Sequence, residues 1–144
     1  MKLGIASDHA GFELKERIKG ELESEGHSVE DFGCYNSESC DYPEFAQKLC
    51  KALLANILER GILVCGTGLG MSYAANRHKG IRAALCLNTY MAEMSRSHND
   101  ANVLVLGSRI TDSDAARSIL RVWMETPFEG GRHLRRIRKI DGES

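Results

Sequence analysis

The chain has 144 residues and a formal net charge of −1, with 19 basic and 20 acidic side chains. This length fits one compact domain that buries its own core, so we expect a single domain over residues 1–144. A nearly neutral chain has no overall field that would draw it to nucleic acid or to a membrane, so any anion must be bound by a local cluster. The apolar run after Met1 is interrupted at Asp8, and no apolar stretch approaches the length of a membrane span. We therefore expect a cytoplasmic protein without a targeting segment.

Five cysteines are spread along the chain, at positions 34, 40, 50, 65 and 86. They form no Cys-x-x-Cys pair, and no histidine accompanies them at the spacing of a zinc site. We expect neither a disulfide framework nor a structural metal. Most free thiols are small core residues, so a chemical role for any of them needs support from its surroundings.

Short apolar runs alternate along the chain with windows of helical periodicity. The expected strands are residues 3–7, 28–32, 61–65, 81–86 and 102–106. The first expected helix is residues 11–25, with charges opposite an apolar face. A loop over 33–41 leads to a second helix that opens at 41–43. The other expected helices are residues 71–77, 89–97, 112–125 and 132–140. Asp41 can cap the second helix, and Pro43 is tolerated in its first turn. This alternation predicts an α/β protein, with a parallel sheet of about five strands and helices on both faces.

Ligands of open α/β sheets bind outside the carboxyl ends of the strands. Those ends carry Asp8-His9, Cys65 with the loop Gly66–Gly70, and Gly107-Ser108-Arg109. His98-Asn99 comes just before the fifth strand, so the fold need not place it at the same edge. A lone histidine in such a polar cluster is more often a surface or capping residue.

The loop Gly66–Gly70 leads from an apolar strand into a helix. Glycines let a ligand approach the backbone, and the helix start offers unpaired N–H groups to a phosphate or an oxyanion. A tight turn without a ligand is an equally good interpretation. Met71 stands where a dinucleotide fingerprint needs glycine and where a cysteine phosphatase loop needs arginine, so both of these motifs are excluded.

Cys65 ends the strand immediately before this helix start, where the helix dipole and nearby N–H donors favour a thiolate. A thiolate there could act as a nucleophile or as a general base. The alternative is that Cys65 completes the apolar strand as a core residue.

Arg132 and Arg136 are four residues apart, so on a helix they share a face that suits a phosphate. The segment around them is broadly basic, which leaves a solvated tail or an RNA contact as alternatives. The neutral net charge and the lack of interleaved aromatic residues favour nucleic acid only weakly.

Taken together and in chain order, the motifs of this sequence resemble those of the type B ribose-5-phosphate isomerases. These enzymes belong to the superfamily that includes galactose-6-phosphate and allose-6-phosphate isomerases. The matching segments are residues 7–12, 41–43, 65–72, 74–76, 80–83, 95–103, 107–109, 129–133 and 136. Each segment is weak alone, but the ordered set spans nearly the whole chain.

The resemblance implies a Rossmann-like three-layer α/β/α fold and interconversion of ribose 5-phosphate and ribulose 5-phosphate without metal or cofactor, as in the pentose phosphate pathway. It implies a homodimer, or a dimer of dimers, with active sites at the subunit interface. A hexose 6-phosphate (allose or galactose) is the alternative substrate. A non-catalytic, flavodoxin-like domain that binds phosphate or nucleotide is the alternative function.

The resemblance also implies roles for individual residues. Some members of the family use a cysteine at the position of Cys65 as base, and others use a glutamate further along the loop, where this chain has no carboxylate. The catalytic residues are then Cys65, His98, which opens the sugar ring, and Thr67. The substrate-binding residues are Asp8, His9, Tyr42, Gly66, Thr67, Gly68, Leu69, Gly70, Asn99, Arg109, Arg132 and Arg136.

Overall fold

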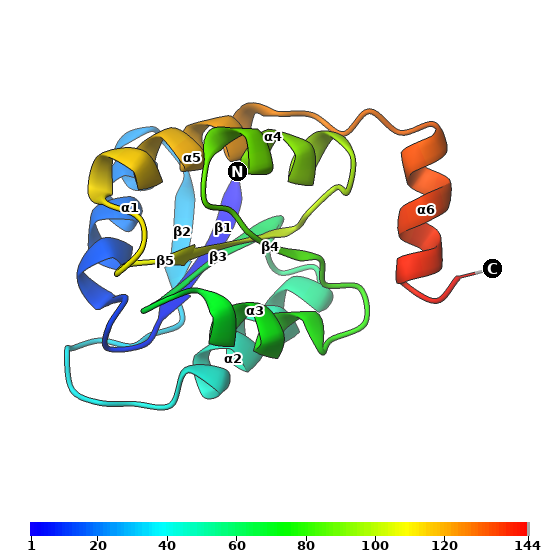
Figure 1. The fold of residues 1–144 in the computed structure, drawn as a ribbon. Helices are drawn as coiled ribbons and strands as arrows, with labels where there is room; N and C mark the ends of the chain where they lie inside the picture. The colour runs from blue at the N-terminus through cyan, green and yellow to red at the C-terminus, as the bar shows by residue number, and fades with distance from the viewer. Residues whose placement is uncertain (144) are drawn as a thin grey trace.

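The computed structural model describes residues 1–143; Ser144, the last residue of the expected domain, lies outside them. A five-stranded, all-parallel sheet of order β2-β1-β3-β5-β4 forms the middle of the molecule (Figure 1). Its strands are β1 (Lys2–Ser7), β2 (Ser28–Asp31), β3 (Arg60–Cys65), β4 (Ala83–Leu85) and β5 (Val103–Gly107). The helices are α1 (Phe12–Ser24), α2 (Tyr42–Leu54), α3 (Leu69–Asn76), α4 (Thr89–Ser97), α5 (Ser113–Glu125) and α6 (Arg132–Ile140). The expected three-layer α/β architecture is confirmed.

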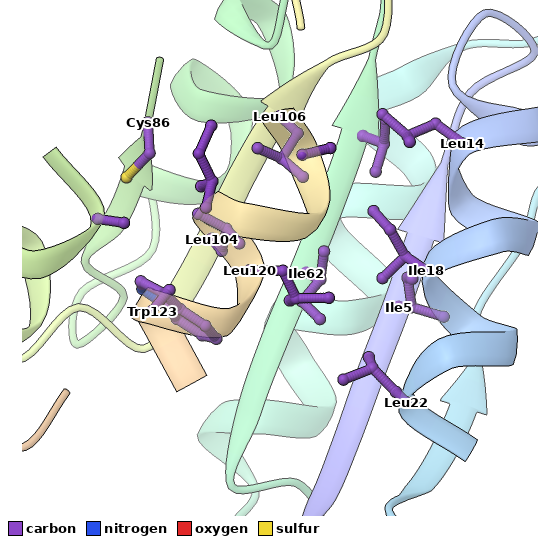
Figure 2. Close-up of a cluster of buried hydrophobic side chains, with 14 of the residues drawn as sticks. Ile5, Leu14, Ile18, Leu22, Ile62, Cys86, Leu104, Leu106, Leu120 and Trp123 are labelled. Carbon is purple, nitrogen blue, oxygen red and sulfur yellow. The ribbon is translucent and has the colours of Figure 1, made fainter. Parts of the chain in front are cut away.

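Alternate side chains of the central strands enter two separate cores. Ile62 and Val64 of β3 pack with α1 and α5 on one face (Figure 2), and Leu63 and Cys65 pack with α2 and α3 on the other. Figure 2 shows Trp123 of α5 and Ile18 of α1 over the first face. Because both faces are covered, β3 and β5 are apolar at nearly every position, as in other parallel sheets.

Three local expectations need correction. The fourth strand is only Ala83–Leu85: the Arg82 N–H donates to the Asn102 side chain (Oδ1, 2.8 Å), and the Arg82 carbonyl accepts from the Asn102 N–H (3.1 Å). Helix α3 begins at Leu69, directly after Gly68, whose φ of +82° ends the turn. Asp41 stands at the N-cap of α2, but its side chain makes no capping hydrogen bond.

The path of the chain decides which residues meet. From β1 the chain moves outward to β2 and then crosses to β3 on the other side of β1, so the carboxyl ends of β1 and β3 meet at the switch point of the sheet. Helix α4 leads from the carboxyl end of β4 to the amino end of β5. Helix α6 follows an extended segment and stands apart from the sheet, beyond the β4 edge (Figure 1). No helix in residues 1–143 has the length and apolar content needed to cross a membrane.

Candidate active site

Cys65 lies at the switch point, with its sulfur facing the glycine loop. The backbone N–H of Gly68 donates to Cys65 Sγ at 3.2 Å, and the N–H of Leu69 donates to Thr67 Oγ1 at 3.2 Å. The Cys65 residue is only 4 % exposed. A sulfur held next to a helix start and a peptide donor is well placed to carry negative charge.

Asp8 and His9 follow β1 and border the same position. The Asp8 N–H donates to the carbonyl of Val64 (3.2 Å), and Asp8 Oδ1 accepts from the N–H of Gly11 (3.0 Å). The N–H of Cys40 donates to His9 Nδ1 at 3.3 Å. Since Nδ1 accepts this bond, the neutral ring carries its proton on Nε2, which is free to donate elsewhere.

Arg109 and Tyr42 complete this group from two further segments. The N–H of Arg109 donates to the carbonyl of Gly66 (2.9 Å), and a Cβ built on Gly66 would lie 3.1 Å from Arg109 Nη1. A Cβ built on Gly70 would lie 2.5 Å from Tyr42 Cζ, so the tyrosine ring covers the start of α3. We call Asp8, His9, Tyr42, Cys65–Gly70 and Arg109 the carboxyl-edge cluster. It unites ten of the residues that the sequence singled out.

The remaining four expected site residues lie at the opposite edge of the sheet. His98 is the C-cap of α4, and the carbonyl of Asn99 accepts from Arg82 Nε (2.9 Å) just before β4. The rings of His98 and His133 stack with centroids 4.2 Å apart and planes 11° apart, which brings the start of α6 to His98. We call His98, Asn99, Glu129, Arg132, His133 and Arg136 the amino-edge cluster.

Glu129 and His133 were missed as individual residues, although both lie in the segment 129–133 that carried part of the resemblance. Glu129 Oε2 lies 3.8 Å from His98 Nε2 and 3.4 Å from His133 Nε2. Burial, together with the positive charge of His98 and Arg132, lowers the pKa of His133, and Glu129 opposes this shift. His133 therefore remains a neutral ring in this basic surrounding at neutral pH.

The two clusters do not meet within one chain. They lie at opposite ends of parallel strands, and a strand such as β5 alone separates its ends by roughly 13 Å. Between α6 and the β4 edge lies a groove of about 680 Å³ that includes Asn99, Met91 and Ile140 but not Cys65. If His98 and Cys65 act on the same substrate molecule, one of the two clusters must therefore come from a second chain.

The other thiols differ from Cys65 in their surroundings. All five cysteines in residues 1–143 are free. Burial raises the pKa of Cys50 to about 12 and that of Cys86 to about 11. These two thiols are therefore core residues that stay protonated at neutral pH.

The sequence and fold of this chain match those of known proteins. The model of the ribose/galactose isomerase family matches residues 3–140. The chain is 43 % identical over 139 residues to ribose-5-phosphate isomerase B of Escherichia coli, covering 96 % of this chain and 93 % of that one. A structure of ribose-5-phosphate isomerase B from Clostridium thermocellum superposes with a TM-score of 0.98 at 51 % identity, covering 99 % of this chain and 96 % of the other. The isomerase from Thermotoga maritima gives a TM-score of 0.96 at 57 % identity, with 98 % and 97 % covered. The chain belongs to the ribose/galactose isomerase family.

Proposed function

We propose that this chain interconverts ribose 5-phosphate and ribulose 5-phosphate through an enediolate, without metal or nucleotide. The observation that carries this proposal is the Cys65 sulfur, held at 3.2 Å by the Gly68 N–H at the switch point of the sheet. Isomerisation needs a base beside donors that can stabilise an oxyanion, and this loop supplies both. Family membership supports the same activity.

In the proposed reaction, the Cys65 thiolate removes the proton from the carbon next to the carbonyl and returns it to the neighbouring carbon. The N–H groups of Gly66–Gly70 stabilise the negative charge of the enediolate. Thr67 moves a proton between the two sugar oxygens. Asp8 and Tyr42 contact the sugar from the flanking segments.

The amino-edge cluster supplies the other half of the chemistry. His98 protonates the ring oxygen to open the sugar, and Asn99 holds a hydroxyl or the enediolate end. Arg132 and Arg136 bind the phosphate together with Arg109 and His9. Binding energy from the phosphate, which does not react, then positions the reacting carbon.

Each active site therefore combines the carboxyl-edge cluster of one copy with the amino-edge cluster of its partner, in a homodimer or a dimer of dimers. The separation of the two clusters within one chain supports this arrangement, as does the position of α6 away from the sheet. We also propose that the protein is one isomerase domain that works in the cytoplasm, where its five thiols stay reduced.

Turnover of ribose 5-phosphate by the purified protein tests the activity, with allose 6-phosphate assayed in parallel and each substrate measured with and without a chelator. We expect higher kcat/KM for the pentose and no effect of the chelator. Binding of either sugar without turnover would contradict the isomerase proposal and support the non-catalytic alternative.

Complementation between two inactive variants tests the shared site. Cys65→Ala and His98→Asn are dissociated, mixed in equal amounts and allowed to reassociate. Half of the dimers are then hybrids, and each hybrid has one site with neither substitution, so about one quarter of wild-type activity should return. If Cys65 and His98 acted within one chain, the mixture would stay inactive.

A further inference from the structure

Glu129 and His133 lie against His98, which the proposed reaction uses to open the sugar ring. The N–H of Glu129 donates to the carbonyl of Ser97 at 3.0 Å, which fixes the segment before α6 against the last residue of α4. This bond holds the Glu129 carboxylate beside both imidazoles, 3.8 Å from His98 Nε2 and 3.4 Å from His133 Nε2.

His133 is the buried member of this group, and His98 is the more exposed one. The His133 side chain is 8 % exposed, whereas that of His98 is 37 % exposed. A half-exposed histidine at a helix end has several rotamers open to it. Stacking at 4.2 Å on a buried ring restricts that freedom, so His98 has one favoured orientation before substrate arrives.

The spacing of the three groups would also suit a metal ion, since their donor atoms lie within 4.8 Å of one another. Two features argue against that use. The rings are stacked in nearly parallel planes, so their in-plane lone pairs lie in separate planes and do not converge on one point. Arg132 and Arg136 add positive charge next to His133. This cluster suits proton transfer better than cation binding.

We propose that Glu129 and His133 are positioning residues that fix the His98 ring for opening of the sugar, an inference that rests on the proposed function. Glu129 also counters the charge that His98 carries as an acid. The charged and titratable groups around the stack are Glu129 from the preceding segment, Arg132, His133 and Arg136 from α6, and Asp100, which pairs with Arg96 at 2.8 Å. Glu129 is the carboxylate that reaches both rings.

The two substrates distinguish ring opening by His98 from proton transfer by Cys65. Ribose 5-phosphate enters as a ring that must be opened. Ribulose 5-phosphate is open-chain, because its O5 carries the phosphate and cannot close a five-membered ring. In D₂O, Cys65 can remove the C1 proton of ribulose 5-phosphate, exchange it with solvent and return deuterium to C1 without ring opening.

The test compares Glu129→Gln with wild type in both assays, with Glu125→Gln as the matched control. Glu125 is also exposed, and it has no ion pair in residues 1–143. For Glu129→Gln we expect kcat for ribose 5-phosphate to fall about ten-fold with little change in KM, while deuterium exchange into ribulose 5-phosphate stays within about two-fold of wild type. Glu125→Gln should match wild type in both assays.

A second pair of variants tests the stack. His133→Phe keeps a ring against His98, and His133→Ala removes it, so the phenylalanine variant should retain more ring-opening activity. An equal fall of isomerisation and exchange in Glu129→Gln would overturn the inference, as would no change in either. If the wild-type chain neither turns over ribose 5-phosphate nor exchanges deuterium, the proposed function fails, and the positioning role fails with it.

Discussion

At the scale of single residues, the main prediction concerns the Cys65 sulfur. Cys65→Ala should lower kcat by about 10³-fold or more while substrate still binds, because the base is lost but the phosphate contacts remain. Steady-state kinetics and calorimetric binding of ribulose 5-phosphate measure the two effects. Cys50→Ala is the matched control: it removes a buried core thiol at a cost of about 1 kcal/mol in stability and leaves kcat unchanged. Near-normal turnover by Cys65→Ala would contradict the proposed base.

Neighbouring arginines on α6 allow an equally direct test of phosphate binding. Arg136→Ala should raise KM about ten-fold with a smaller effect on kcat, because it removes a charge-assisted contact to a group that does not react. Arg135 is also exposed and is the adjacent residue, so it points to a different side of the helix. Arg135→Ala should therefore keep the wild-type KM. An equal rise of KM in both variants would mean that general positive charge, not a specific contact, attracts the phosphate.

Residue-level reasoning from sequence succeeded where the neighbours are local. Cys65, Gly68 and Thr67 lie within four positions, so an apolar strand followed by a glycine loop was enough to predict the surroundings of the sulfur. The contact of Glu129 with His98 depends on how α6 returns to α4 across 31 positions, and no local pattern encodes that path. Lys15 shows the same limit, because the charges of α1 were expected opposite its apolar face. It is fully buried, with Nζ 2.8 Å from Asp31 Oδ2 and 2.6 Å from the carbonyl of Cys34.

At the scale of elements, the tight crossing of the glycine loop over the end of β5 can be tested. A Cβ built on Gly107 would lie 2.4 Å from the carbonyl oxygen of Thr67, so Gly107→Ala must displace the loop that carries the site. We expect a loss of about 1–3 kcal/mol in the free energy of unfolding and a fall in kcat. Gly20 in α1 has no atom within 4 Å of its built Cβ, so Gly20→Ala should stabilise the protein by up to about 1 kcal/mol and leave kcat unchanged. Chemical denaturation and kinetics on both variants check this; wild-type stability in Gly107→Ala would contradict it.

Periodicity predicted the elements well because the core strands are continuous apolar runs between amphipathic helices. β3 begins one residue earlier than expected, and β5 is shifted by one residue at both ends. The largest error among the strands is β4, an edge strand that within residues 1–143 pairs with β5 over three residues. The apolar residues at the ends of the expected strand, Ile81 and Cys86, are buried outside β4, so hydrophobicity alone could not mark where pairing stops.

At the scale of the assembly, the surface next to the glycine loop exposes apolar side chains. Leu69 and Tyr73 are four residues apart on α3 and are 47 % and 62 % exposed. Tyr42 borders the same hollow, together with Gly70. Arginines from a partner that reach the Cys65 loop must pass close to this face, so in the proposed assembly a second copy covers it.

Tyr73→Glu should therefore weaken association without altering the fold of the separate chain. A carboxylate placed in an apolar interface loses its hydration, so the dimer should dissociate at higher protein concentration than wild type. Specific activity should then fall steeply on dilution and recover on concentration, in step with the mass measured by analytical ultracentrifugation. Ile57→Glu, which adds the same charge at an exposed apolar position in the loop before β3, should follow the wild-type curve. A Tyr73→Glu variant whose activity did not depend on its concentration, while its mass fell to that of one chain, would show that a single copy holds the complete site.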